Sequence, residues 1–238
     1  MCTSCPVYDA AMANLIAAVV FFLGIHFGVS GTRLRDSLVR VVGDKLFRGL
    51  FALASLVGLI WLIKAYSAAP YIALWGKLLA LKPVAEPLVL IAAAFVVIGV
   101  STPSPAGASG ESQLTREVKV RGVTRITRHP FLWGTALWAL VHFVVNGDFA
   151  SSLAFGSLLV LAVGGTASID AKRRRAYGER WEQFAQQTSN VPFAAIVAGR
   201  TQLGAALREI GIVRPLVAIA VFAALFFLHG RFFGAPLT

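Results

Sequence analysis

The sequence predicts an all-α, polytopic integral membrane protein: a helical bundle of about six transmembrane helices and two interfacial amphipathic helices. Of its 238 residues, 57% are hydrophobic and only 14% are charged, whereas a soluble domain carries about 25% charged residues. The mean hydropathy is +0.74. Apolar runs long enough to cross a bilayer, about 20 residues each, alternate with basic segments. We therefore expect one membrane domain, residues 1–238, whose main partner is the lipid bilayer.

The first half of the chain contains three apolar spans. They cover residues 10–30, 50–66 and 84–100. Residues 31–49 are basic, with apolar residues at helical spacing, which predicts an amphipathic helix on the membrane surface. Residues 67–83 contain Tyr and Trp and suit the membrane interface. No basic n-region or small-residue cleavage site marks a signal peptide, so we expect the first helix to be retained.

The second half opens with residues 101–117, which are rich in Ser, Pro and Gly and predict a flexible loop. The fourth and fifth spans, 131–146 and 150–168, are separated by Asn-Gly-Asp at 146–148. This turn signal predicts a tight helical hairpin.

The C-terminal part combines an interfacial helix with a final span. Residues 170–187 place aromatic side chains on one helical face and arginines on the other, which predicts the second amphipathic helix. The aromatic residues are Tyr177, Trp181 and Phe184. Residues 188–213 form a connection, and the sixth span covers 214–233.

Basic residues are distributed as the positive-inside rule requires. Loops one, three and five carry five, five and eight Lys and Arg residues, the last count including Arg214 at the start of the sixth span, and the remaining segments share the other four of the 22. We therefore expect both termini on the outer side of a bacterial inner membrane. The net charge of +11 also suits nucleic-acid binding. We exclude a nucleic-acid partner because the arginines flank apolar spans and no soluble domain is large enough to carry a binding face.

Cys2 and Cys5 form one CxxC at the N-terminus. Such a pair can serve metal or redox chemistry, but no second CxxC and no nearby histidine completes a site. We interpret the two thiols as part of an N-terminal tail.

Histidines are the main candidates for chemistry because ionisable residues inside a membrane are costly and usually functional. His26 lies in the first span, His142 in the fourth, His129 at the mouth of the fourth, and His229 near the outer surface. His142 can be a helix-packing residue or an axial ligand of haem iron. At about 1.5 Å per residue, His26 and His142 differ in depth by roughly 10 Å, so His26 with His129 is a competing pair.

Three arginines precede the fourth span. Arg121, Arg125 and Arg128 have i, i+4, i+7 spacing, so a helix would align them on one face. They can contact lipid headgroups or clamp an anionic group such as a phosphate or a cofactor carboxylate.

The central segment RGVTRITRHPFLWGTALWALVHFVVNGD, with FGS, SIDAKRRR, TSNVPFAAIVAGR and the earlier GIHFG, resembles the NnrU family of membrane proteins over roughly residues 12–200. NnrU proteins are associated with denitrification, around nitrite and nitric oxide metabolism. The family is related to plant 15-cis-zeta-carotene isomerase, which uses haem b held by histidines. The resemblance therefore implies His26 and His142 as axial ligands, with His129 nearby. The isomerase has a cysteine shortly before its second histidine, whereas this chain reads LWALVH there.

Three functions follow as hypotheses. The first is a haem b-binding protein that isomerises a lipophilic polyene, with Arg121, Arg125 and Arg128 near the haem propionates. The second is a non-catalytic accessory protein for nitrite or nitric-oxide reductase. The third rests on RHP, AYGERWEQF and VPF, which are similar to isoprenylcysteine-type membrane methyltransferases and imply S-adenosylmethionine near His129. Where those enzymes carry an acidic pair, this chain reads Asp-Ala-Lys-Arg at 170–173.

Overall fold

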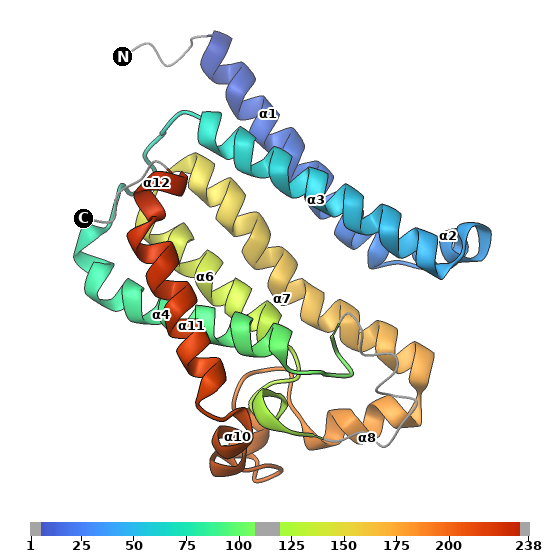
Figure 1. The fold of residues 1–238 in the computed structure, drawn as a ribbon. Helices are drawn as coiled ribbons and strands as arrows, with labels where there is room; N and C mark the ends of the chain where they lie inside the picture. Colours follow the sequence, from blue (N-terminus) through green and yellow to red (C-terminus); the bar gives the residue numbers. More distant parts are fainter. Residues whose placement is uncertain (1–5, 108–119, 234–238) are drawn as a thin grey trace. The chain divides into compact units, whose positions relative to one another are not determined.

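The computed structural model describes residues 6–107 and 120–233, and in these residues every regular element is a helix (Figure 1). The prediction of an all-α fold is confirmed. The predicted CxxC tail and most of the Ser-, Pro- and Gly-rich loop lie outside the described residues. The first elements are α1 (Pro6–Leu23), the π-helix η1 (Gly24–Ser30), α2 (Leu34–Val42), α3 (Asp44–Ala68), the 3₁₀ turn η2 (Leu79–Leu81) and α4 (Lys82–Ser101). The later ones are the 3₁₀ turn η3 (Gly122–Arg125), α6 (Pro130–Asn146), α7 (Phe149–Tyr177), α8 (Glu179–Gln187), α9 (Ala194–Val197), α10 (Leu203–Ile210), α11 (Val213–Phe227) and α12 (His229–Phe233).

Within residues 6–107 and 120–233, four apolar helices are long enough to cross a membrane: Val7–Ser30, Asp44–Ala68, Leu79–Ser101 and Phe149–Tyr177. A fifth is formed if α10 and α11, which are bent by 73° at their junction, count as one span. The predicted fourth span corresponds to α6, which has 17 residues and is at the lower limit of length for a spanning helix. The polytopic membrane fold is thus supported, whereas the number of six spans stays a prediction.

Two predicted boundaries were wrong. The helix of the fifth span does not end near residue 168. It is α7, which has 29 residues and ends at Tyr177. Its Ala, Lys and Arg residues favour helix, and the break comes only at Gly178, which has a φ of +49°. The first amphipathic helix is confined to α2, because Gly43, with a φ of +82°, ends it and α3 begins at the next residue.

The aromatic face predicted for residues 170–187 is present. Trp181 and Phe184 on α8 are fully buried and pack with Ala106, and Tyr177 lies partly buried against them. This face therefore packs inside the protein, although composition alone suggested the membrane surface. The last predicted span is also interrupted, at Leu228, between α11 and α12.

The chain folds as two compact units. Unit 1 comprises Met1–Lys82 and His142–Leu161, and unit 2 comprises Pro83–Val141 and Ala162–Thr238. In unit 1, α1 and α3 form an antiparallel pair in which Gly58 lets α3 approach the rings of Phe21 and Phe22 closely. The fully or nearly fully buried side chains of this unit include Leu15, Ala18, Leu62, Ala65 and Ala150.

Unit 1 also contains the turn between α6 and α7. The carbonyl oxygen of Gly147 accepts backbone N–H bonds of 2.9–3.1 Å from Leu74, Trp75 and Gly76. Gly147 has a φ of +63°, and a Cβ atom here would lie 1.9 Å from the carbonyl oxygen of Gly76. The predicted Asn-Gly-Asp turn is confirmed, and its glycine is required both by conformation and by space.

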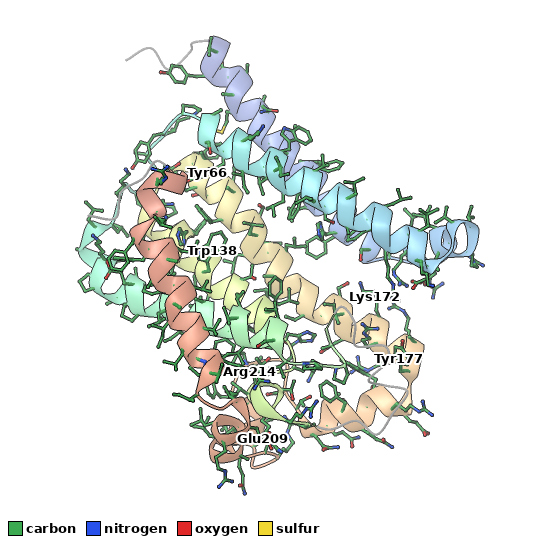
Figure 2. The ribbon with its side chains drawn as sticks, in the orientation of Figure 1. Tyr66, Trp138, Lys172, Tyr177, Glu209 and Arg214 are labelled. Carbon is green, nitrogen blue, oxygen red and sulfur yellow. The ribbon has the colours of Figure 1, made fainter. Side chains whose placement is uncertain are left out.

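In unit 2, α4 packs closely on α6 at two glycines. Cβ atoms at Gly99 and Gly134 would lie 2.8 Å from the Phe131 nitrogen and 2.7 Å from the Ala92 carbonyl oxygen, respectively. A small apolar core joins the end of α4, the η3 turn and α10 through Ile98, Val123, Ile126, Ala206 and Ile210. Figure 2 labels Glu209 on α10 and Arg214 at the start of α11.

The Gly147 turn yields the first testable expectation. Gly147→Ala should lower the free energy of unfolding in mixed micelles by about 2 kcal/mol or more, because the new Cβ clashes with rigid backbone at a positive φ. Gly199→Ala is the matched control, since Gly199 has a φ of +69° with open space around its Cβ position. The control should cost only about 1 kcal/mol. Equal losses for the two variants would show that the Gly76 contact is unimportant.

Candidate functional site

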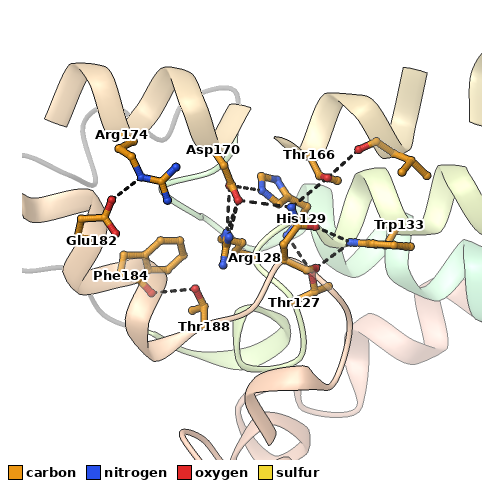
Figure 3. Close-up of polar contacts among 12 residues, drawn as sticks. Thr127, Arg128, His129, Trp133, Thr166, Asp170, Arg174, Glu182, Phe184 and Thr188 are labelled. Carbon is orange, nitrogen blue, oxygen red and sulfur yellow. Dashed lines mark hydrogen bonds and ion pairs between the residues drawn. The ribbon is translucent and has the colours of Figure 1, made fainter. Parts of the chain in front are cut away.

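Four side chains in unit 2 form a buried polar group, which we name the Asp170 cluster. It consists of Arg128, His129 and Asp170, which are labelled in Figure 3, together with Asn190. The side chains of Arg128, His129 and Asp170 are 11%, 1% and 10% exposed. Charged groups are almost never buried to this degree unless they are paired.

The carboxylate of Asp170 accepts hydrogen bonds from Arg128 and His129, two consecutive residues just before α6. The Nε atom of Arg128 lies 3.0 Å from each carboxylate oxygen, and its Nη2 atom also donates to Oδ2. The Nε2 atom of His129 lies 2.6 Å from Oδ1. Because an ionised carboxylate only accepts hydrogen bonds, the proton of this contact belongs to Nε2.

The local sequence explains why Arg128 and His129 lie here. Pro130 is the first residue of α6, a position where its missing N–H and fixed φ favour helix initiation. His129 precedes it, and its carbonyl oxygen accepts the first helical bond, from the N–H of Trp133 at 3.0 Å. The Oγ1 atom of Thr127 accepts the backbone N–H of His129 at 3.2 Å. The Arg-His-Pro sequence thus ends the preceding segment and directs two polar side chains toward α7.

Asn190 connects the cluster to the segment after α8. Its Nδ2 atom donates to Thr166 Oγ1 at 3.0 Å and to Asp170 Oδ2 at 3.4 Å. Its backbone oxygen accepts bonds from Trp133 Nε1 at 2.8 Å and from Thr127 Oγ1 at 2.5 Å. The cluster therefore fixes α6, α7 and residue 190 to one another through satisfied polar groups.

An imidazole oriented by a carboxylate is a common acid–base arrangement. Asp170 engages Nε2 of His129, so only Nδ1 is left to meet a bound group. The predicted S-adenosylmethionine site at His129 stays a prediction, and a haem ligand pair of His26 with His129 would have to use this Nδ1 atom.

The three arginines predicted to share a helical face make contacts in different places. Residues 122–125 form only a short 3₁₀ turn, because Gly122 has a φ of +58° and Pro130 soon follows. Arg125 binds Glu209 with Nε and Nη2 at 2.9 and 2.8 Å, and this carboxylate raises the pKa of the Arg125 guanidinium above its usual value. Arg128 binds Asp170, and Arg121 lines a separate cavity in unit 2. The prediction of one helical arginine face was wrong.

His26 lies in unit 1 within η1, a seven-residue π-helix. The π-helical conformation is rare and is frequently found at functional sites. The Nδ1 atom of His26 donates to the carbonyl oxygen of Phe22 at 2.7 Å, and this bond orients the ring. The rings of Phe22 and Phe51 lie 4.5 and 5.3 Å from the imidazole, measured between centroids.

His142 contacts another part of unit 1. Its ring lies 4.9 Å from that of Phe155, which in turn lies 5.5 Å from the ring of Tyr66 on α3. His26 contacts Phe51, 15 residues before Tyr66 on the same helix, which corresponds to roughly 22 Å along its axis. The two histidines thus pack beside different levels of α3.

A haem iron shared by His26 and His142 would require their ligating nitrogens to lie close together. With metal–nitrogen bonds of about 2.1 Å, the two axial nitrogens must lie about 4 Å apart. The contacts of His26 and His142 give no support to that pairing, although the chemistry of His26 suits a single ligand, since a second bond orients its ring. Among the described residues, no group of three or more His, Cys, Asp or Glu side chains could hold a metal ion.

The sequence interpretation did not assign Asp170 or Asn190 to a site. A signal for Asp170 was present, because it is a lone carboxylate near the end of an apolar run, where ionisable residues are functional by default. Asn190 carried no comparable signal. Only the fold shows that it lies between Thr166 and Asp170.

Comparison with known proteins identifies the family. The family model described as NnrU protein matches residues 14–237, further toward the C-terminus than the segment 12–200 recognised above. The chain belongs to the NnrU family. The chloroplastic 15-cis-zeta-carotene isomerase of Zea mays is 27% identical over 97% of this chain, and that of Arabidopsis thaliana is 28% identical over 94%. The chain spans about 60% of the length of these relatives, namely 62% and 59%. No solved structure gave a significant match.

The Asp170 cluster leads to a second expectation. Asp170→Asn keeps the shape of the side chain but leaves the Arg128 guanidinium, 11% exposed, without its counter-charge. Breaking a buried pair in this way should lower the free energy of unfolding by about 3 kcal/mol. Asp36→Asn is the matched control, because Asp36 is 60% exposed and pairs with Arg35 at 3.7 Å. The control should lose about 0–1 kcal/mol, and a similarly small loss for Asp170→Asn would show that the cluster does not stabilise the fold.

Proposed function

We propose that this NnrU protein is an integral membrane isomerase that acts on a lipophilic polyene. The observation that carries the proposal is the likeness to 15-cis-zeta-carotene isomerase along 94–97% of this chain. The likeness covers nearly the whole of this chain, including its apolar helices, and is not confined to one segment. In this proposal the substrate is a conjugated hydrocarbon with a cis double bond.

The exposed surface of the helices suits a substrate that is dissolved in the bilayer. Along α3, large apolar side chains such as Leu53, Leu56 and Val57 are more than half exposed. A hydrocarbon offers no hydrogen-bonding groups, so its site requires apolar contact area rather than polar recognition. We infer that the polyene enters laterally from the lipid.

Cis–trans isomerisation adds no atoms and removes none, so the protein needs only to weaken one double bond and allow rotation. We propose haem b as the group that does this, because a bound iron centre can act as a Lewis acid toward a conjugated double bond. His26 would be a ligand, with the Phe22 carbonyl oxygen fixing the orientation of its ring. The rings of Phe22 and Phe51 would keep the surroundings of this imidazole apolar.

The activity has a direct test. The full-length protein, purified with added haem and reconstituted in nanodiscs, should convert 15-cis-zeta-carotene to the 15-trans isomer, as measured by chromatography with absorption detection. Empty nanodiscs with the same haem content are the control for uncatalysed isomerisation. Haem-loaded protein that leaves the polyene unchanged would contradict the isomerase proposal. That result would favour the alternative of an accessory protein for nitrite or nitric-oxide reductase.

The cofactor assignment is tested separately by absorption spectroscopy of the oxidised and dithionite-reduced protein. His26→Ala should lower the haem content of the purified protein at least about tenfold, the usual minimum for loss of a ligand or its orienting partner. His229→Ala, a histidine of α12 near the end of the chain, should leave the haem content unchanged. His142→Ala reports on the predicted second ligand through a change in the position of the Soret band. Unchanged haem content and spectra in all three variants would remove His26 and His142 as haem ligands.

A further inference from the structure

Unit 2 contains a cavity of about 330 Å³ that is separate from the Asp170 cluster. It is lined by residues from three segments distant in the sequence, namely Thr102, Pro103, Arg121, Gly122, Glu209 and Arg214. At roughly 30 Å³ per water molecule, its volume corresponds to about ten waters, which exceeds the needs of a single ion.

The charges of the described residues that line this cavity do not cancel. The carboxylate of Glu209 is already engaged, because it accepts both bonds of the Arg125 fork and the backbone N–H of Gly122. Arg125 thus balances Glu209, and Arg121 and Arg214 remain as two cations on the wall. Such a wall favours an anionic ligand.

Arg214 is held in place for this role. Its Nη1 atom donates to the carbonyl oxygen of Ile210 at 2.9 Å, at the C-terminal end of α10. A guanidinium carries five N–H donors in a fixed plane, so this bond fixes the group and leaves donors for a ligand. Arg214 also lies in the first turn of α11, where the helix dipole adds positive potential.

The position of the cavity along the chain points to a lipid. Its lining residues lie just after the end of apolar α4 at Ser101 and include Arg214 in the first turn of α11, which starts at Val213. The side chains of Val213, Leu216 and Val217 on α11 are 68%, 56% and 46% exposed. Basic pockets between membrane helices at their cytoplasmic ends bind anionic headgroups. We propose that this cavity binds the phosphate of an anionic phospholipid headgroup, with the acyl chains lying along α11.

The test measures lipid binding by the detergent-purified, full-length protein with native mass spectrometry during titration with phosphatidylglycerol. Arg121→Gln and Arg214→Gln should each weaken binding about fivefold, the effect expected for one basic residue at a membrane surface. Arg208→Gln is the matched control, because Arg208 is an exposed residue of α10 outside the cavity lining and its replacement removes the same charge. The control should stay within about twofold of the wild type.

Two outcomes would overturn the proposal. Equal affinities for Arg121→Gln and Arg208→Gln would assign lipid binding to general surface charge. A parallel titration with inorganic phosphate separates a lipid site from a soluble-anion site. If inorganic phosphate alone protects the protein thermally as well as phosphatidylglycerol does, and loses its effect in Arg121→Gln, the ligand is a soluble anion. Arg121→Gln keeps the test valid if Arg214→Gln disturbs the end of α10.

Discussion

Burial of the Asp170 carboxylate is the constraint on which the rest of unit 2 depends. Taking an ionised carboxylate out of water costs several kcal/mol unless a cation and further donors compensate. Here Arg128 and His129 supply the compensation, and Asn190 adds a third donor. Because Arg128 and His129 are the last two residues before Pro130, the requirement to satisfy one carboxylate also fixes where α6 begins and how residue 190 meets α7.

The apolar architecture could be predicted from sequence because its causes are local. Bilayer thickness sets the length of an apolar run, and turn residues such as Gly147 act over a few positions. The predicted spans 84–100 and 131–146 therefore agree with α4 and α6 within two residues at each end. The end of α7 was missed because a rise in charge indicates the membrane interface, but does not stop a helix that lacks a breaker before Gly178.

The site was predicted less completely, because its pairings are not local. Scarcity of ionisable residues in apolar runs was sufficient to select His26 and His142, and the π-helix around His26 adds a structural reason that no pattern supplied. The arginine spacing assumed a helix that Gly122 prevents. The partner of Arg125 lies 84 residues away and that of Arg128 42 residues away, and sequence spacing carries no information on such distances.

These long-range pairs also change how the basic loops should be interpreted. The positive-inside rule counts every Lys and Arg near a span, as if each faced the lipid headgroups. In the loop that precedes α6, however, Arg125 and Arg128 form ion pairs with Glu209 and Asp170 within the protein. The charge left for the membrane is therefore smaller than the count suggests and is concentrated at particular points. Arg121 and Arg214 form such a point, since their cavity joins the ends of two apolar helices and the one carboxylate among its described lining residues is already neutralised.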